Sequence, residues 1–388
     1  DVGYDAAHIN LLDATPTIGD VYANGQWRTI LVGGMGAGGR YYYALDITDP
    51  ASPALLWEFS DTNLGLTFGN PVITKDAKGT WLVAFTSGIN NVGDGRGRLY
   101  LLDALTGKPR TGAGEIITTA GDASTPSNLG RLNAWVPSDA DNTALRFYAG
   151  DMLGNLWRFD HDDRVAPSGI EATLLGQALG PNLVPQPITG KPVLTELVND
   201  NMPITVVSFG TGRLLNNADL TSTGLQTIYS IRDTLDSTGL GPLRDPNAKL
   251  VRQKLNSNRR LDDAQSVNWN AQNGWYVDLD QSSGERVSLD GIPLASGLIA
   301  FASTVPNGDP CGNGGSSFLY QFLLPSGDVR DVEVSNSLIV GVSRVMDSTG
   351  RVSAFFTKRD QSTQLKAAGV GLGNRSNTLR RAAWRELN

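Results

Sequence analysis

The feature that most constrains the fold is an internal repeat whose copies each end in aspartate. Each copy runs from one apolar strand pattern through a loop into a second, and Asp46, Asp103 and Asp160 close the first three copies. The two intervals are equal, 57 residues from 46 to 103 and again from 103 to 160. A further apolar run precedes the inner pair, at 17–22 in the first copy and 70–74 in the second. Each copy therefore predicts a small sheet of several short strands.

Repeated small sheets favour a β-propeller. A single sheet leaves two edges and one face uncovered, whereas sheets packed radially, face on face, leave only short edges. The aspartate that ends each copy is expected to cap the following turn, as in 103–107. There the carboxylate can accept backbone hydrogen bonds while Gly107 takes the left-handed conformation. An open array of sandwiched sheets is the structural alternative.

The pattern continues more loosely through the rest of the chain. It gives five clear copies and strand material for one or two more. The apolar runs are 191–194, 204–210 and 227–231 in the fourth copy, 274–279, 297–302 and 317–322 in the fifth, and 332–345 and 352–357 beyond. We interpret the polar, irregular stretch 234–272 as an insertion and 359–388 as a mobile tail. The whole chain, 1–388, is then one β-propeller domain.

Composition supports an all-β fold and argues against several classes of function. The 388 residues include 45 glycines and only 18% charged residues, which suits many tight turns. The net charge is −7 with no basic run, which argues against nucleic-acid binding. No apolar stretch approaches the roughly 18 residues of a membrane span. The start at Asp1 shows no signal-peptide pattern, and of a cytosolic protein or a fragment of a longer secreted precursor we favour the fragment.

Catalytic patterns are scarce. The chain has no Gly-x-Ser-x-Gly elbow, and its two histidines are His8 and His161. Cys311 is the single cysteine, so it makes no internal disulfide, and we interpret it as an inert or formerly paired thiol in a glycine-rich loop. The glycine-rich stretch 33–39 lacks the Lys-Ser/Thr that follows a phosphate loop. A carboxylate pair for glycoside hydrolysis is conceivable, but turn capping explains most aspartates better.

One stretch, 137–145, has the pattern of a metal-binding loop. Alternating aspartates such as Asp139 and Asp141 can converge on a hard cation, with a backbone carbonyl in the shell. Calcium takes six or more oxygens, and two carboxylates give too few. From the residues alone, a solvated loop is the simpler interpretation.

Several segments together resemble the C-terminal domain of the PilY/PilC-type adhesins of type IV pilus tips. The matching segments are 13–21, 27–34, 42–46, 148–160, 274–279, 284–287 and 384–387. The match spans nearly the whole chain, and the run from Tyr148 to Asp160 is specific. The resemblance implies a modified, roughly seven-bladed, quinoprotein-like β-propeller. It also implies that the chain is the C-terminal part of an exported protein of the cell surface, pilus tip or outer membrane.

The resemblance implies a binding function and no catalysis. In the family, this domain supports pilus assembly, opposes retraction, and contributes to adhesion, twitching motility and surface sensing. The implied partners are minor pilins, other pilus components, and host-cell or abiotic surfaces. Two alternatives remain: a quinoprotein-like propeller dehydrogenase, which shares turns like 102–107, and a passive pilus scaffold subunit. Such dehydrogenases usually place adjacent cysteines against the quinone, which one cysteine cannot supply.

Many members of that family carry a calcium loop of the form Asp-x-Asp-x-Asp-x-x-x-Asp. In this chain the four acidic positions fall on Pro137, Asp139, Asp141 and Leu145, with a carbonyl ligand at Thr143. Two of the four carboxylates are therefore missing. The resemblance implies a degenerate calcium site at Asp139, Asp141 and Thr143, with weak calcium binding or none.

Overall fold

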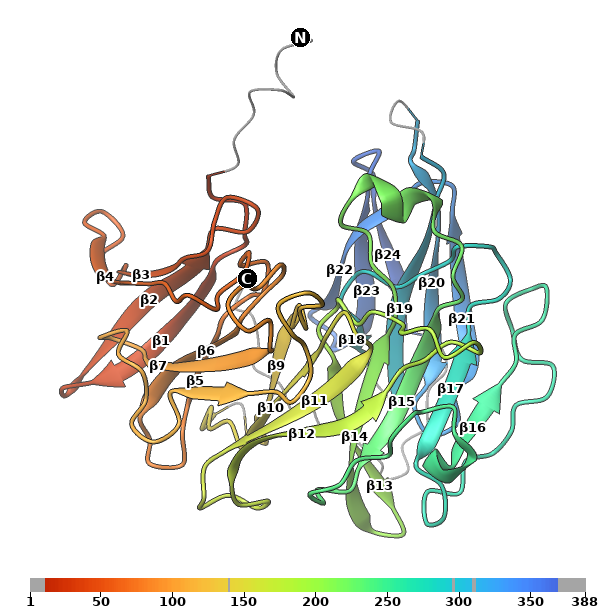
Figure 1. The fold of residues 1–388 in the computed structure, drawn as a ribbon. Coiled ribbons are helices and arrows are strands. Elements are labelled where there is room, and N and C mark those ends of the chain that lie inside the picture. Colours follow the sequence, from red (N-terminus) through yellow and green to blue (C-terminus); the bar gives the residue numbers. More distant parts are fainter. Residues whose placement is uncertain (1–10, 139, 295–296, 309–311, 369–388) are drawn as a thin grey trace. The chain divides into compact units, whose positions relative to one another are not determined.

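The computed structural model describes residues 11–138, 140–294, 297–308 and 312–368. Regular structure in these residues is almost entirely β, with six sheets and two short 3-10 helices, η1 (Asn217–Thr221) and η2 (Pro246–Ala248) (Figure 1). None of the described helices has the length and hydropathy that a membrane crossing requires. The all-β class predicted from the sequence is confirmed.

The chain divides into two compact units. The first contains 11–151 and Trp157–Thr173, and the second contains Met152–Leu156 and Leu174 onwards. The single domain expected for 1–388 and the roughly seven blades both stay predictions.

Three sheets of four strands make up most of the first unit, and in each sheet strands that follow one another in sequence are neighbours. The strands are β1 (Thr17–Ala23), β2 (Gln26–Gly34), β3 (Tyr42–Asp46) and β4 (Ala54–Phe59); β5 (Val72–Lys75), β6 (Trp81–Thr86), β7 (Arg98–Asp103) and β8 (Glu115–Ile117); β9 (Leu132–Trp135), β10 (Arg146–Gly150), β11 (Asn155–His161) and β12 (Ile170–Gln177). One period of the sequence repeat therefore equals one four-stranded sheet.

The repeated aspartates occupy the third strand of each sheet. Asp46 ends β3, Asp103 ends β7, and Asp160 lies in β11. As predicted, Asp103 caps the next turn, since its carboxylate accepts hydrogen bonds from the amide and hydroxyl of Thr106, both at 2.8 Å. Asp46 does the same for the turn after β3, with Thr48 as donor.

The turn-cap prediction is wrong for Asp160. Its side chain is buried and accepts hydrogen bonds from the Arg158 guanidinium, with Nη2 at 2.9 Å. A buried carboxylate needs a charged or hydrogen-bonding partner, and the guanidinium two residues earlier in the same strand supplies it. Sequence position alone does not distinguish this aspartate from the two that cap turns.

The core of the first unit forms where the first sheet packs on the second. The stacked rings of Tyr42 and Phe85 lie 4.0 Å apart, and both side chains are fully buried. Full burial of a large apolar side chain contributes about 1.5–3 kcal/mol. Trp57 Nε1 donates to the carbonyl of Ala104 at 3.0 Å. Gly107 has φ +65°, a conformation that disfavours other residues, and a Cβ there would lie only 2.6 Å from the Trp57 ring. Both the backbone conformation and the close packing therefore require glycine.

The second unit contains three further sheets. Their strands, in spatial order, are β13 (Val193–Asn199), β14 (Met202–Gly210), β15 (Thr227–Asp233), β17 (Gly274–Asp278) and β16 (Leu250–Gln253); β18 (Ile292–Pro293), β19 (Leu298–Pro306), β20 (Gly315–Leu323) and β21 (Asp328–Ser335); β22 (Ile339–Met346), β23 (Val352–Lys358) and β24 (Thr363–Ala367). Trp275 and Phe322, with ring centroids 5.5 Å apart, are part of a large core cluster shared by two of them.

The structure corrects the sequence-based assignment of two segments. Residues 274–279, assigned to the fifth copy, contribute β17 to the fourth sheet, where it pairs with β15. The mobile tail predicted for 359–388 is wrong for Thr363–Ala367, which form β24 and pair with β23. Residues 369–388 lie outside the described residues. The stretch 234–272, which we interpret as an insertion, contributes η2 and the parallel edge strand β16. Strand-to-sheet membership depends on long-range pairing, which the local pattern does not record.

Candidate functional site

Loop 137–145, which carries the predicted metal-binding residues, folds against the end of β5. Asp141 forms an ion pair with Lys75, whose Nζ lies 2.8 Å from the carboxylate. The hydroxyl of Thr143 donates to the same group. Lys75 first and Thr143 second lower the pKa of Asp141 below its usual value. Asp139 lies outside the described residues. The positive charge that pairs with Asp141 is therefore the Lys75 ammonium group of the protein itself.

Backbone hydrogen bonds fix the same loop. The carbonyl of Asn142 accepts from the amide of Lys75 at 2.9 Å and from the hydroxyl of Thr74 at 2.8 Å, and the amide of Ala144 donates to the carbonyl of Lys75 at 3.0 Å. Asn142 has φ +52°, a left-handed conformation that asparagine tolerates better than most residues. The loop therefore keeps its conformation through protein groups.

The described residues of this loop do not provide a calcium shell. Calcium takes six to eight oxygens, whereas the Asp141 carboxylate binds Lys75 and the Asn142 carbonyl already accepts two hydrogen bonds. The one buried side-chain acceptor without a partner in the described part of the loop is Asn142 Oδ1. Across the described residues, no cluster of three or more His, Cys, Asp or Glu side chains is placed to hold a metal.

His161 forms a hydrogen bond with the backbone of the loop. Its Nε2 lies 3.1 Å from the carbonyl of Ala144, and the side chain is fully buried. Burial first, and the positive charge of Arg110 second, lower the pKa of His161 to about 4. The imidazole is therefore neutral near pH 7, with its proton on Nε2 donated to Ala144.

Arg110 joins three elements of the first unit. Its Nη2 lies 3.1 Å from the carboxylate of Asp76, in the β5–β6 turn, and 3.4 Å from that of Asp162, just after β11. Its Nη1 donates to the carbonyl of His161. All three charged side chains are largely buried. We name Asp76, Arg110 and Asp162 the arginine latch, because one guanidinium holds two carboxylates from separate sheets.

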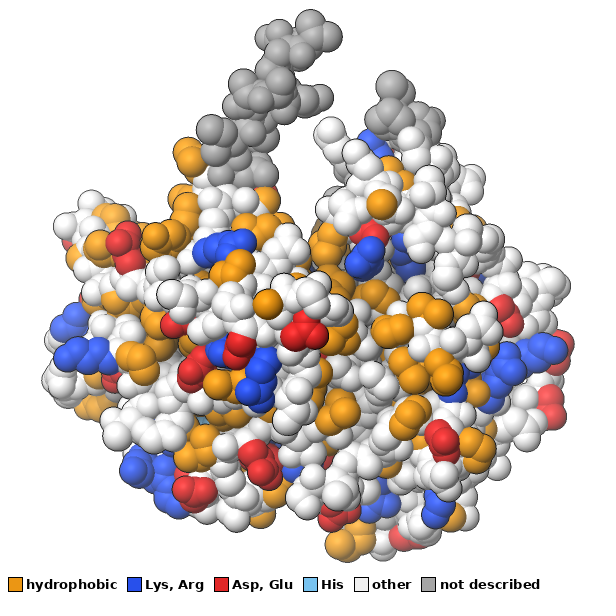
Figure 2. All heavy atoms as spheres, in the orientation of Figure 1, with side chains coloured by type: hydrophobic (Ala, Val, Ile, Leu, Met, Phe, Trp, Pro, Cys, Tyr) orange, Lys and Arg blue, Asp and Glu red, His pale blue; other side chains and the backbone are white. Residues whose placement is uncertain are grey.

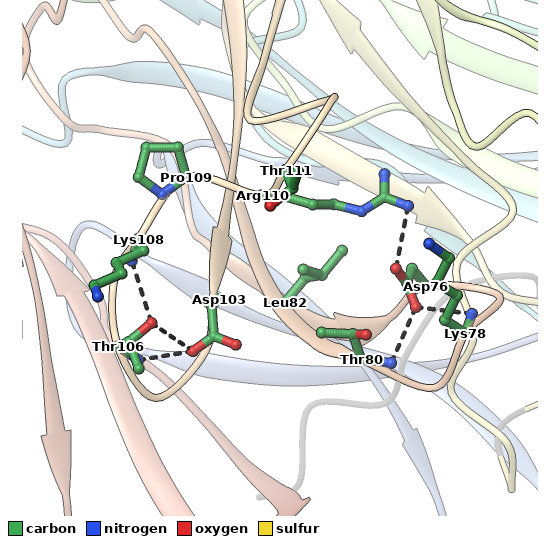
Figure 3. Close-up of a pocket in the computed structure, with 10 residues that line it drawn as sticks. All are labelled: Asp76, Lys78, Thr80, Leu82, Asp103, Thr106, Lys108, Pro109, Arg110 and Thr111. Carbon is green, nitrogen blue, oxygen red and sulfur yellow. Dashed lines mark hydrogen bonds and ion pairs between the residues drawn. The ribbon is translucent and has the colours of Figure 1, made fainter.

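A pocket of about 380 Å³ opens beside the arginine latch, over the buried side chain of Leu82 (Figure 3). Its lining residues are Asp76, Lys78, Thr80, Leu82, Asp103, Thr106, Lys108, Pro109, Arg110 and Thr111. Asp76 and Arg110 bind each other on one side of it, and Asp103 binds its own turn on the other (Figure 3). Lys78 and Lys108 are exposed, and neither forms an ion pair within the described part of the chain. The acidic groups that line the pocket, Asp76 and Asp103, are both bound to other groups of the protein.

The three consecutive tyrosines at the start of β3, Tyr41–Tyr43, divide between core and surface. Tyr42 is fully buried, Tyr41 is 50% exposed, and Tyr43 is half-buried. Strand alternation predicts this division. Cys311 and His8 lie outside the described residues. The sequence analysis missed Lys75 and Arg110, and no local signal links either to a partner 66 or 51 residues away.

Sheets built from one repeated unit, with charged side chains that hold the loops in place, define an all-β, propeller-type domain. A family model described as the PilY1 beta-propeller domain matches residues 1–261. The chain belongs to this family, which confirms the resemblance seen in the sequence.

Known relatives agree with this assignment. The crystal structure of the Pseudomonas aeruginosa PilY1 C-terminal domain matches 91% of this chain and 83% of its own, with a TM-score of 0.74 and 23% identity. The type IV pilus biogenesis factor PilY1 of P. aeruginosa is 29% identical over 82% of this chain, and a Xylella fastidiosa homologue is 29% identical over 98%. The chain spans about a third of the length of these two relatives, 31% and 32%.

Proposed function

We propose that this chain is the propeller-type domain of a type IV pilus biogenesis factor and acts by binding other proteins at the bacterial surface. The observation that carries the proposal is the family match over residues 1–261. The curated relatives that match most of the chain are named type IV pilus biogenesis factors. The finer roles that we propose are support of pilus assembly, control of retraction, twitching motility and surface attachment.

The geometry supports binding over catalysis. In the described residues, the buried charged groups near the pocket hold loops and sheets together, as the arginine latch does. Such a scaffold can present exposed edges and side chains to partners in a fixed arrangement. Minor pilins and other pilus components are the partners that we propose, at the pilus tip or the outer membrane of an exported protein.

We further propose that loop 137–145 works without calcium. Lys75 neutralises Asp141, and the backbone of β5 holds Asn142 in place. Calorimetric titration of the purified chain should show no calcium binding tighter than about 1 mM, the weak end of extracellular calcium modules. Tighter binding that disappears in Asp139→Ala would contradict the proposal.

The pilus role is tested by removing the domain in the bacterium that encodes it. We expect at least a tenfold loss of sheared surface pili and no twitching zone, with both restored by the wild-type gene. The same deletion in a strain unable to retract pili separates the two roles. Pili that return there indicate control of retraction, and pili that stay absent indicate assembly. Normal piliation and twitching in both strains would contradict the proposal.

Attachment is scored separately on the same strains. A variant that assembles pili normally yet attaches poorly supports an adhesive role, whereas loss of attachment only in proportion to pilus number indicates a passive scaffold.

A further inference from the structure

The first sheet has one buried face and one face that the described residues leave largely uncovered. Val21, Val32, Tyr42 and Trp57 are buried on the side that packs against the second sheet. The opposite face carries apolar side chains at positions where polar ones are usual, and several are well exposed. They are Leu12 (66%), Tyr41 (50%) and Leu55 (61%), with Met35, Tyr43 and Leu45 half-buried. Figure 2 shows hydrophobic side chains over this part of the molecule.

These side chains line an open hollow of about 610 Å³. Its lining includes Leu12, Tyr41, Tyr43, Leu55 and Glu58. The strand register explains why they meet, because Tyr43 pairs with Glu58 and Leu45 with Leu55 across β3 and β4. Ligand pockets in proteins commonly have a volume of about 300–1,000 Å³ and an apolar lining with a few polar groups. The hollow is therefore large enough to accept apolar side chains of a partner.

Strand β4 is the edge of this sheet. It pairs with β3 on one side, and on the other its amide and carbonyl groups have no backbone partner within the described residues. An uncovered edge is a template for another strand, and proteins normally block it with charged residues or proline. Between Ala54 and Phe59 the only charged residue is Glu58, and there is no proline.

The fourth strand of another sheet shows the usual protection. Strand β21 carries four charged residues, and they form ion pairs: Asp328 with Arg330, Asp331 with Arg260 and Lys366, and Glu333 with Lys366. Glu58 of β4 is exposed and forms no ion pair within the described part of the chain. The two edges thus differ in whether their charged groups are already paired.

We propose that β4 is a docking edge for an extended segment of a partner protein. The segment adds as a fifth strand to the first sheet, inserts an apolar side chain between Tyr41 and Leu55, and places a basic side chain against Glu58. Strand addition of this kind takes affinity from main-chain hydrogen bonds and specificity from pockets for alternate side chains. The unpaired carboxylate in an apolar hollow selects a segment that is apolar with one basic residue. This inference rests on the proposal that the domain works by protein binding.

The test uses the purified chain and a nine-residue peptide of alternating valine and threonine with one central lysine. Hydrogen exchange should show that the amides of Ala54–Phe59 that face away from β3 exchange rapidly in the free chain and slow at least tenfold with peptide. A peptide N-methylated at alternate residues, which cannot make the main-chain hydrogen bonds, should bind at least tenfold more weakly. Equal binding of both peptides, no binding of either, or slow exchange of the outward-facing Ala54–Phe59 amides in the free chain would overturn the docking edge.

Charge reversal tests the specificity. Glu58→Lys should bind the lysine peptide at least tenfold more weakly and should prefer a matched peptide with a central glutamate. Leu55→Lys should weaken both peptides, whereas Val334→Lys should bind like wild type, because Val334 is an equally exposed apolar residue on β21. An unchanged preference in Glu58→Lys would overturn the proposal.

Two further outcomes separate this inference from others. Dimerisation of the chain alone that is abolished by Leu55→Lys would assign the edge to a second copy and overturn the proposed occupant. If Leu55→Lys loses the peptide but assembles pili normally, the docking edge stands and its link with pilus assembly is overturned. Loss of both supports the two proposals together.

Discussion

Loop 137–145 and the edge strand β4 lie in the same compact unit, but polar groups are paired in the loop and unpaired along the strand within the described residues. In and around the loop, charges and backbone groups are paired: Lys75 with Asp141, and Arg110 with two buried carboxylates. Along β4, the outer backbone groups and Glu58 have no partner within the described residues. Paired groups contribute to the stability of the unit, and unpaired ones are available to a partner. Substitutions in the two regions should therefore change different measurements.

The largest effect on stability is expected for Arg110→Met. This change leaves Asp76 and Asp162, whose side chains are 3% and 2% exposed, without their shared guanidinium. Removing one partner of a buried ion pair typically costs about 3–5 kcal/mol. Urea unfolding followed by tryptophan fluorescence measures the loss.

Arg164→Met is the matched control, since Arg164 binds the same Asp162 at 2.7 Å but is 41% exposed. It should lower the urea midpoint far less than Arg110→Met. Equal losses for the two variants would show that the latch is no more important than a surface pair.

The next effect is pH dependence through His161. Its folded pKa is about 4, below the ordinary value of 6.5. Between these values the unfolded chain binds a proton that the folded chain does not, so stability is complete above pH 6.5 and falls as the pH drops towards 4. The shift corresponds to about 3 kcal/mol at most.

His161→Gln removes the titrating group but keeps an amide that can donate to Ala144. The decline in urea midpoint between pH 6.5 and 4.5 should be shallower in this variant than in wild type. A decline of the same slope would assign the acid sensitivity to other groups.

A smaller effect is expected at the loop itself. Lys75→Met breaks the ion pair with Asp141, but Asp141 is 59% exposed, so the loss should stay below about 1 kcal/mol. Lys78→Met is the control, because Lys78 is exposed and forms no ion pair within the described residues. If Lys75→Met unfolds the unit, the backbone hydrogen bonds of Asn142 do not hold the loop on their own.

The sequence predicted what is local and missed what is long-range. Strand positions and the turn caps at Asp46 and Asp103 follow from side-chain alternation and from a carboxylate near its own turn. The partner of Asp160 did not follow, because burial decides it and the repeat does not record burial.

The sequence also could not predict which side chains pair when they come from segments far apart along the chain. Lys75 meets Asp141 only after β5 and the loop come together, 66 residues apart in sequence. The open edge at β4 is also a tertiary property, since a strand is an edge only when no other strand lies beside it. The metal-binding candidates stay a prediction, and what the sequence did not indicate is that the fold places the Lys75 ammonium group beside Asp141.

The smallest stability effect, and the sharpest contrast with the arginine latch, is expected for Glu58→Gln. The change removes a charge that has no partner within the described residues. The free energy of unfolding, measured by urea titration, should therefore change by no more than about 0.5 kcal/mol. The same variant should bind the lysine peptide several-fold more weakly, because a neutral amide gives up the charge-assisted hydrogen bond to the basic side chain. Measured together, unfolding and peptide binding separate the two regions: a variant of the latch changes the first, and a variant of the edge changes the second. A marked loss of stability in Glu58→Gln would mean that this carboxylate already has a partner in the folded chain, and β4 would then resemble β21.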